Sequence, residues 1–188
     1  MLPILLPVLL AQAPLTDGGA VVMKGQRFLA EVARTDVEKA RGLMYRTNLA
    51  KDRCMFFAYD EDSPRTIWMK NCLISLDVVW VDASGRIVEV AERVPPCSPM
   101  RGDDCPYYGG KAVSRHFVEF PAGTLRRLRV KVGDRIGWDL RLMDGSRIKG
   151  GLAVPAARGR QERLCCPSLP ADCLILPIPF IRAPRAAS

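Results

Sequence analysis

The chain has 188 residues, of which 48% are hydrophobic and 26% are charged, a balance that argues against global disorder. This length suffices for one domain with a hydrophobic core and falls short of two ordinary domains. The formal net charge of +8 would favour anionic partners, but the basic residues are scattered along the chain. In the densest group, residues 125–131, basic and apolar side chains alternate, which favours the solvated face of an amphipathic element over a nucleic-acid site.

Seven cysteines and a single histidine bound the chemistry further. So many cysteines favour an oxidising compartment. With one histidine and no C-x-x-C pair, a tetrahedral zinc site has few ligands available. We therefore predict no metal and no cofactor.

The first residues resemble part of a signal peptide. Residues 2–10 are apolar and lead to Ala11-Gln12-Ala13, a small-x-small pattern that signal peptidase recognises. We expect a signal peptide over 1–13, export to the periplasm, the envelope or the medium, and a linker over 14–27. The missing basic residues and Pro14 argue against cleavage, so a disordered apolar leader or a short membrane-associated segment stays open. The run is too short for a transmembrane helix.

A strand followed by a short helix is predicted next. Apolar residues alternate over 28–33, as in a half-buried strand. Thr35 and Glu38 form a capping-box pattern, which predicts a helix that starts there and ends near Met44, because Gly42 weakens its last turn. Residues 45–51 read as a loop.

Three further strands are predicted in the middle of the chain. Residues 54–59 and 76–81 are apolar enough to be buried strands, and 76–81 is apolar on both alternating faces except at Asp77. The turn residues 82–85 and the alternating segment 86–90 then complete a hairpin with the second of these strands. The stretch 65–75 is expected to be a turn leading into it.

Residues 95–110 are rich in Pro, Gly, Ser and Asp and are predicted to be a long loop. Cys97 and Cys105 lie within it, and a disulfide between them would stabilise the fold by about 2 to 3 kcal/mol on the loop-entropy model. The alternative is a paired-thiol metal or redox site.

The last predicted elements are a strand over 113–120, a short helix capped by Thr124, and a strand over 130–136. Residues 150–188 contain many prolines and no sustained period, so we expect a poorly ordered tail. The sequence leaves open the pairing of five cysteines: Cys54, Cys72, Cys165, Cys166 and Cys173.

Several stretches carry a resemblance to a known family, and the two most specific are 38–46 and 65–77. The chain reads EKARGLMYR over 38–46 and RTIWMKNCLISLD over 65–77, followed by VWVDASGR over 79–86. In these it resembles the bacterial and archaeal proteins of the domain of unknown function 192 family. The resemblance implies a compact, mainly β domain, bordering on α+β, over 28–149. It would be an antiparallel barrel or sandwich with one or two short helices, and the family has no established activity. Cys54, Cys72 and Ser75 replace other small residues of the family pattern, which fits packing positions better than catalytic ones.

An enzyme is one hypothesis. Lys70 and Asp77 could form an acid/base pair in a hydrolase-like cleft, with His116 as a third titratable group. The structural alternative, which we favour, is that Asp77 pairs with Lys70 or an arginine, caps the backbone of the preceding turn and so fixes a core strand, and that His116 is a hydrogen-bonded core residue.

A binding module is the second hypothesis. Trp68 would be a stacking surface and the arginines would be bidentate donors to an anionic or sugar-like molecule, or to an envelope component. The candidate ligand contacts are Arg41, Arg46, Arg65, Trp68, Lys70, Asn71 and Asp77.

An electrostatic binder of anionic polymer, driven by the +8 charge, is a third hypothesis. We predict a small, monomeric, exported domain with a non-catalytic ligand-binding or structural role in the cell envelope. We expect no nucleic-acid partner.

Overall fold

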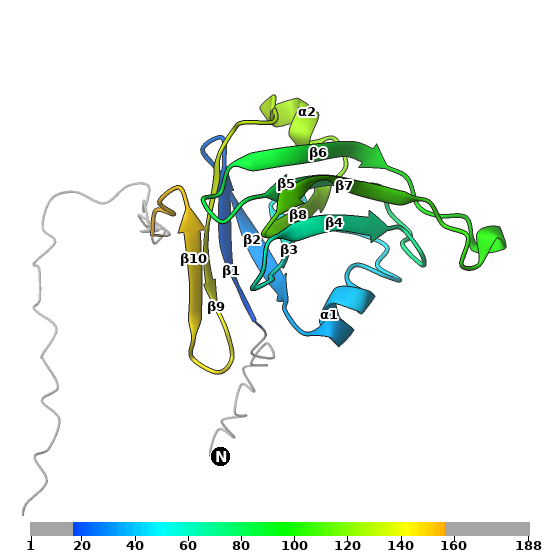
Figure 1. The fold of residues 1–188 in the computed structure, drawn as a ribbon, viewed down its shortest axis with the longest axis horizontal. Helices are drawn as coiled ribbons and strands as arrows, with labels where there is room; N and C mark the ends of the chain where they lie inside the picture. Colours follow the sequence, from blue (N-terminus) through cyan, green and yellow to red (C-terminus); the bar gives the residue numbers. More distant parts are fainter. Residues whose placement is uncertain (1–16, 157–188) are drawn as a thin grey trace, which may run out of the picture. The chain divides into compact units, whose positions relative to one another are not determined.

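The computed structural model describes residues 17–156, and every structural feature below belongs to that part of the chain. Strands dominate it, as Figure 1 shows, so the prediction of a mainly β fold with short helices is confirmed. The strands are β1 (Gly18–Met23), β2 (Gln26–Ala33), β3 (Arg53–Phe57), β4 (Ser63–Trp68), β5 (Leu76–Val81), β6 (Ile87–Val94), β7 (Tyr107–Ser114), β8 (His116–Pro121), β9 (Ile136–Arg141) and β10 (Arg147–Gly151). The helices are α1 (Asp36–Arg41), the 3-10 turn η1 (Pro99–Arg101) and α2 (Thr124–Leu128).

Eight strands form one curled sheet, in the order β10-β9-β1-β2-β3-β8-β5-β6. Neighbours are antiparallel except β2 and β3, which run parallel. The turn before β9 bonds back to the start of β6: the N–H of Gly133 donates to the carbonyl of Ile87 at 2.8 Å, and that of Ile136 to Gly85 at 2.8 Å. These bonds join the regions of β9 and β6, which are far apart in the strand order. The sheet therefore curls into a half-barrel.

A second sheet of β4 and β7 lies against the curled one. Gly109 in β7 has φ +85°, and a Cβ atom there would come within 2.2 Å of the Trp80 ring of β5. Glycine therefore lets β7 approach that indole closely. The contact positions the second sheet over β5.

Both faces of the central strands are covered, as predicted for 76–81. All six residues of β5 are buried. Val79 and Val81 belong to the core inside the curl, whereas Val78 and Trp80 belong to a second core between the curled sheet and the smaller one. Polar side chains on β5 and on its neighbour β8 are thereby enclosed on whichever face they occupy.

The capping box is confirmed. The hydroxyl of Thr35 accepts from the N–H of Glu38 at 3.2 Å, and the carboxylate of Glu38 accepts from the N–H of Thr35 at 2.9 Å. The helix ends before Gly42, which has φ 43°. Val37 of this helix is 79% exposed, and α1 itself has no buried residue.

Several predicted boundaries were wrong in the first two thirds of the domain. β1 occupies residues that were expected to be linker, where two adjacent strands supply hydrogen-bond partners. Residues 65–68 lie in β4 and not in a turn, because β7 pairs with them. The expected loop 95–110 ends at Tyr107, and the single strand predicted over 113–120 is two strands, β7 and β8, separated at Arg115.

Boundaries after Gly123 also differ. Thr124 does not cap α2: its hydroxyl donates to the carbonyl of Pro121 at 2.6 Å, and Gly123 is the N-cap residue without a side-chain bond. Of the strand expected over 130–136, only Ile136 belongs to a strand, and the hairpin of β9 and β10 follows. β9 pairs with β10, whose last residue is Gly151.

Two predictions lie outside the described residues: the signal peptide over 1–13 and, from 157 onward, the poorly ordered tail with Cys165, Cys166 and Cys173. Within 17–156, none of the helices has the length and apolar character needed to cross a membrane.

Candidate functional site

Asp77, the most buried of the predicted site residues, is part of the core. It has no exposed surface, and its Oδ1 accepts from the N–H of Arg93 at 2.8 Å while its Oδ2 accepts from the N–H of Leu125 at 2.8 Å. The carboxylate thus satisfies a backbone amide near the end of β6 and another in the first turn of α2. The structural interpretation was correct that Asp77 caps backbone amides and was wrong about its partners. The amides belong to Arg93 and Leu125 and not to the preceding turn, and neither Lys70 nor an arginine side chain pairs with Asp77.

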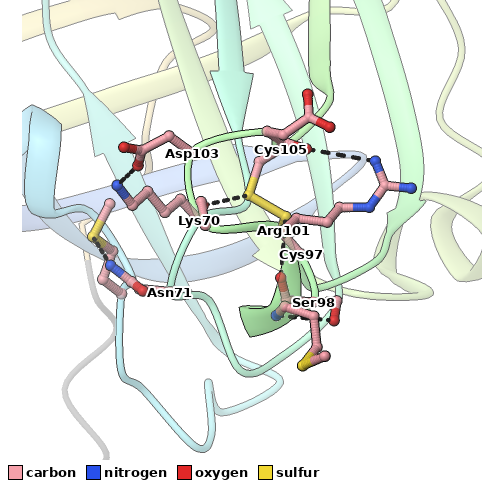
Figure 2. Close-up of a disulfide and its surroundings, with 11 residues drawn as sticks. Lys70, Asn71, Cys97, Ser98, Arg101, Asp103 and Cys105 are labelled. Carbon is pink, nitrogen blue, oxygen red and sulfur yellow. Dashed lines mark hydrogen bonds and ion pairs between the residues drawn. A yellow bond between two sulfur atoms is a disulfide. The ribbon is translucent and has the colours of Figure 1, made fainter.

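Lys70 lies elsewhere, beside the loop that holds the disulfide (Figure 2). Its ammonium forms an ion pair with Asp103, whose side chain is 82% exposed. Cys97 and Cys105 are joined in this loop, with Cα atoms 5.8 Å apart. An exposed pair of this kind contributes about 0 to 1 kcal/mol. Lys70 and Asp77 therefore have separate partners, and the structure does not form the acid/base pair.

Asn71 connects two loops. It adopts φ 56°, in the left-handed region that asparagine tolerates. Its backbone carbonyl accepts a hydrogen bond from the N–H of Tyr45 at 2.8 Å, and its side-chain Nδ2 is 3.8 Å from the sulfur of Met44. Asn71 and Lys70 also line a cavity of about 590 Å³ next to the disulfide. The backbone carbonyl and the Nδ2 atom of Asn71 thus join the segment after α1 to the segment after β4.

Two of the predicted arginines already have partners. Arg46 binds the carboxylate of Glu31 through both terminal nitrogens, at 2.8 and 2.6 Å, and this hydrogen bonding raises the pKa of the Arg46 guanidinium. Arg65 lies over the ring of Tyr59, 3.5 Å from its centroid, and Nη2 donates to the carbonyl of Glu61 at 2.5 Å. Arg46 is therefore not a free bidentate donor to a ligand, whereas Arg65 keeps a buried Nε that has no partner among the described residues.

The remaining two candidates, Arg41 and Trp68, line the same cavity, together with a residue that the sequence analysis missed. The cavity has a volume of about 120 Å³ and lies between α1 and β4; we call it the α1–β4 cavity. Glu119 of β8 also lines it. The Trp68 ring lies parallel to that of Tyr107, with centroids 6.1 Å apart, so this indole is already stacked within the protein.

Glu119 is enclosed without a partner. Glu119 is 6% exposed, and its Oε2 atom has no hydrogen bond within the described residues. Burial raises the pKa of its carboxyl from 4.5 to about 8. A carboxyl in these surroundings is neutral at pH 7 and can both donate and accept a hydrogen bond.

The other lining residues give the α1–β4 cavity an apolar wall and a cationic rim. Phe57, Phe117 and Ile67 are buried, whereas Ala40, Arg41 and Thr66 are exposed, so the cavity extends from the surface toward Glu119. Arg41 forms no salt bridge within 17–156. Lys39 lies over the Tyr59 ring at 4.1 Å. The complete lining is Lys39, Ala40, Arg41, Gly42, Leu43, Met44, Phe57, Tyr59, Thr66, Ile67, Trp68, Cys72, Phe117 and Glu119.

Glu119 left a weak signal in the sequence: an acidic residue between Val118 and Phe120 in a predicted strand. In a strand, Glu119 shares a face with Phe117. A strand face that carries polar residues is normally predicted to face solvent. Only the packing of α1 and β4 over that face encloses it. The local pattern alone therefore cannot distinguish a solvated glutamate from an enclosed one.

His116 and the free cysteines are core residues. His116 Nδ1 accepts from the N–H of Tyr59 at 3.2 Å, as expected for a hydrogen-bonded core histidine, and burial lowers the pKa of its imidazole to about 4. Cys54 and Cys72 are buried and form no disulfide with another cysteine of residues 17–156, and burial raises the pKa of both thiols, that of Cys72 to about 11. Across residues 17–156 no group of three or more His, Cys, Asp or Glu side chains could hold a metal ion.

Comparisons with known proteins place this geometry in a family context. The model of the DUF192 family, described as "Uncharacterized ACR", matches residues 20–138. A UPF0127 protein of Thermococcus gammatolerans is 30% identical over 112 residues, which are 58% of this chain and 66% of that protein, just under two thirds of its length.

Two crystal structures resemble this one. A protein of unknown function from Novosphingobium aromaticivorans has a TM-score of 0.57 and 28% identity, covering 68% of this chain and 94% of that one. A Sinorhizobium meliloti protein, provisionally described as a transcription regulator, has a TM-score of 0.58 and 26% identity, covering 67% of this chain and 98% of that one.

Proposed function

This chain belongs to the domain of unknown function 192 family, and from that premise we propose that it is a small exported domain that binds a small polar ligand without transforming it. The observation that carries this proposal is the position of Glu119, whose side chain lines the α1–β4 cavity and whose buried Oε2 has no partner within residues 17–156. A buried polar atom left without a partner costs about 1 to 3 kcal/mol. A ligand that bonds to it would remove that cost.

The walls of the α1–β4 cavity come from both of the most specific stretches that carry the family resemblance. Residues 39–44 contribute from α1 and the turn after it, and residues 66–68 contribute from β4. Trp68 and Arg41, two of the residues selected from the sequence, are among them. This convergence on one concave site supports ligand binding as the role of these residues.

A binding role is better supported than catalysis. Lys70 and Asp77 have separate partners, and Glu119 is the single carboxyl group among the described residues lining the α1–β4 cavity. The thiol of Cys72, with its pKa raised to about 11, is a poor nucleophile at neutral pH. The cavity therefore lacks an acid/base pair or an activated nucleophile built from the described residues.

The binding hypothesis is tested with a cavity-blocking variant. Ala40 lines the α1–β4 cavity and is exposed, so Ala40→Phe places a ring in the entrance without disturbing the core. Val37→Phe is the matched control on the same helix, at a position outside the lining. Wild type and both variants are screened by thermal shift against metabolites and glycans, and hits are titrated by calorimetry.

We expect at least one ligand whose affinity falls at least tenfold in Ala40→Phe and stays unchanged in Val37→Phe. Finding no ligand, or one that both variants bind as tightly as wild type, would contradict the proposal.

Export is supported by the apolar leader, the seven cysteines and the disulfide between Cys97 and Cys105. Its test is fractionation of bacteria expressing the full chain, with N-terminal sequencing of the product. We expect an envelope or secreted product that begins at Pro14. A full-length cytoplasmic product with free thiols at both cysteines would refute export and leave the binding proposal standing.

A further inference from the structure

We propose, on the basis of the binding function above, that the ligand of the α1–β4 cavity is a small hydroxycarboxylate. Its hydroxyl group would bond to Glu119 at the inner end, and its carboxylate would face Arg41 and Lys39 at the outer end.

The inner end requires a ligand group that can hydrogen-bond to a carboxyl. Glu119 is enclosed by apolar and aromatic side chains, and its Oε2 is unpartnered within the described residues. Because burial raises its pKa to about 8, the group is uncharged at neutral pH and does not call for a cation. A hydroxyl group, which both donates and accepts, matches a neutral carboxyl.

The outer end favours an anion. Arg41 and Lys39 both line the cavity, and neither forms a salt bridge with another described residue. Arg41 of α1 is exposed and Lys39 is half-buried, whereas Glu119 of β8 is buried, so the two cations lie toward the surface end of the cavity and the carboxyl lies at its inner end. A ligand that joins an anionic end to a hydroxylated end fits both ends of the cavity.

The volume restricts the size of the ligand. At about 30 Å³ per water in the liquid, about 120 Å³ corresponds to roughly four waters. Sites for drug-sized ligands have roughly 300 to 1,000 Å³. The α1–β4 cavity therefore suits a three-carbon acid, or the corresponding end of a longer sugar acid.

Other charged and titratable groups near Glu119 bear on its pH response. Cys72 and Tyr59 both line the cavity, and the charge of Glu119 raises the pKa of each, although burial is the larger cause. Neither ionises near neutral pH. Charged and titratable groups lie near the Glu119 carboxyl and near Tyr59, which follows β3. They are Asp36, Lys39 and Arg41 of α1, Arg65 of β4, and Cys72 after β4.

Four three-carbon probes separate the requirements: glycerate carries both groups, propionate lacks hydroxyls, glycerol lacks the charge, and serinol (2-amino-1,3-propanediol) carries the opposite charge. Binding to the full chain is measured by NMR chemical shifts of the Trp68 indole at pH 7. We expect glycerate to bind at least tenfold more tightly than propionate or glycerol, and serinol not to bind.

Variants assign the two ends. Glu119→Leu removes the inner hydrogen bond, and Arg41→Gln removes an outer charge; each should weaken glycerate binding at least fivefold. Arg126→Gln, an exposed position on α2 outside the cavity, is the control that removes the same net charge. In wild type the affinity should fall between pH 7 and 9 as Glu119 ionises and repels the carboxylate, and Glu119→Gln should show no such fall in whatever binding it retains.

Tight binding of serinol, or equal binding of glycerol and glycerate, would overturn the hydroxycarboxylate assignment while keeping the α1–β4 cavity as a binding site. Failure of all four probes would also overturn it. In that event the Ala40→Phe screen decides separately whether the binding function itself is wrong.

Discussion

The Oδ2 atom of Asp77 accepts a hydrogen bond of 2.8 Å from the backbone N–H of Leu125, 48 residues later in the chain. This buried bond replaces the local cap that Thr124 was expected to provide for α2. It also accounts for the acidic residue in an otherwise apolar strand, because the carboxylate serves two backbone amides.

Replacing Asp77 should lower stability. Asp77→Ala leaves the amides of Arg93 and Leu125 without an acceptor, at about 1 to 3 kcal/mol each, so we expect a loss of roughly 2 to 6 kcal/mol. Asp77→Asn keeps one acceptor oxygen and should lose less. Urea unfolding measures both, with Lys70→Ala as the control; its exposed ion pair with Asp103 should change stability by about 1 kcal/mol or less. Equal effects of Asp77→Ala and Lys70→Ala would contradict this assignment.

His116 should resist protonation in the folded protein. Burial lowers the pKa of its imidazole from 6.5 to about 4, with the charge of Arg115 adding to the effect. The unfolded chain therefore takes up a proton first as the pH falls, and His116 contributes a loss of stability of about 1.4 kcal/mol per pH unit between 6.5 and 4. The chain has one histidine, so its NMR resonances report the titration directly. A midpoint near 6.5 in the folded state would show that the imidazole is solvated.

Glu119 should make stability fall as the pH rises. Its pKa is raised from 4.5 to about 8, so the folded state keeps a proton that the unfolded state has lost; the stability this gives is complete below 4.5 and is lost as the pH rises through 8. Between 4.5 and 6.5 the opposite slope of His116 masks this effect, so the window to use is pH 6.5 to 8.

In that window wild type should lose roughly 1 to 2 kcal/mol. Thermal or urea unfolding of Glu119→Gln, which cannot ionise, should show a flat profile. A wild-type profile that is equally flat would mean that Glu119 ionises normally in the folded protein.

Removing the disulfide should cost stability without changing the cavity. Cys97 and Cys105 are separated by 8 positions, so the loop-entropy model gives a loss of about 2 to 3 kcal/mol for the double variant Cys97→Ser/Cys105→Ser. Neither cysteine lines the α1–β4 cavity. Ligand affinity measured well below the unfolding temperature should therefore match wild type, and a large loss of affinity in a folded double variant would connect this loop to the site.

Some features follow from neighbours in the sequence. Thr35 and Glu38 form their capping box across one helical turn, and the turn at 82–85 closes the hairpin of β5 and β6. Both depend on contacts a few residues apart, which local patterns record. The burial of both faces of β5 could also be predicted, because a continuous apolar run has no polar face to present to water.

Other features depend on which strands meet. β1 lies between β2 and β9, and β4 is paired by β7, so strand formation there requires partners that the local sequence does not specify. The candidate site divides in the same way. Arg41 and Trp68 reach one cavity because α1 lies beside β4, whereas Lys70 and Asp77 separate because the first follows β4 and the second is inside β5.

The sequence by itself determined the family through its motifs, the mainly β class through that resemblance, and the capped helix and the hairpin through contacts across short spans of chain. The tertiary structure alone decided that Asp77 caps α2 and that Glu119 lies at a cavity with its Oε2 unpartnered among the described residues. The physical reason is that burial and hydrogen-bond partners are properties of packed surfaces. The side chain of Glu119 resembles a solvated glutamate until α1 and β4 enclose it and remove the water that would have kept it charged.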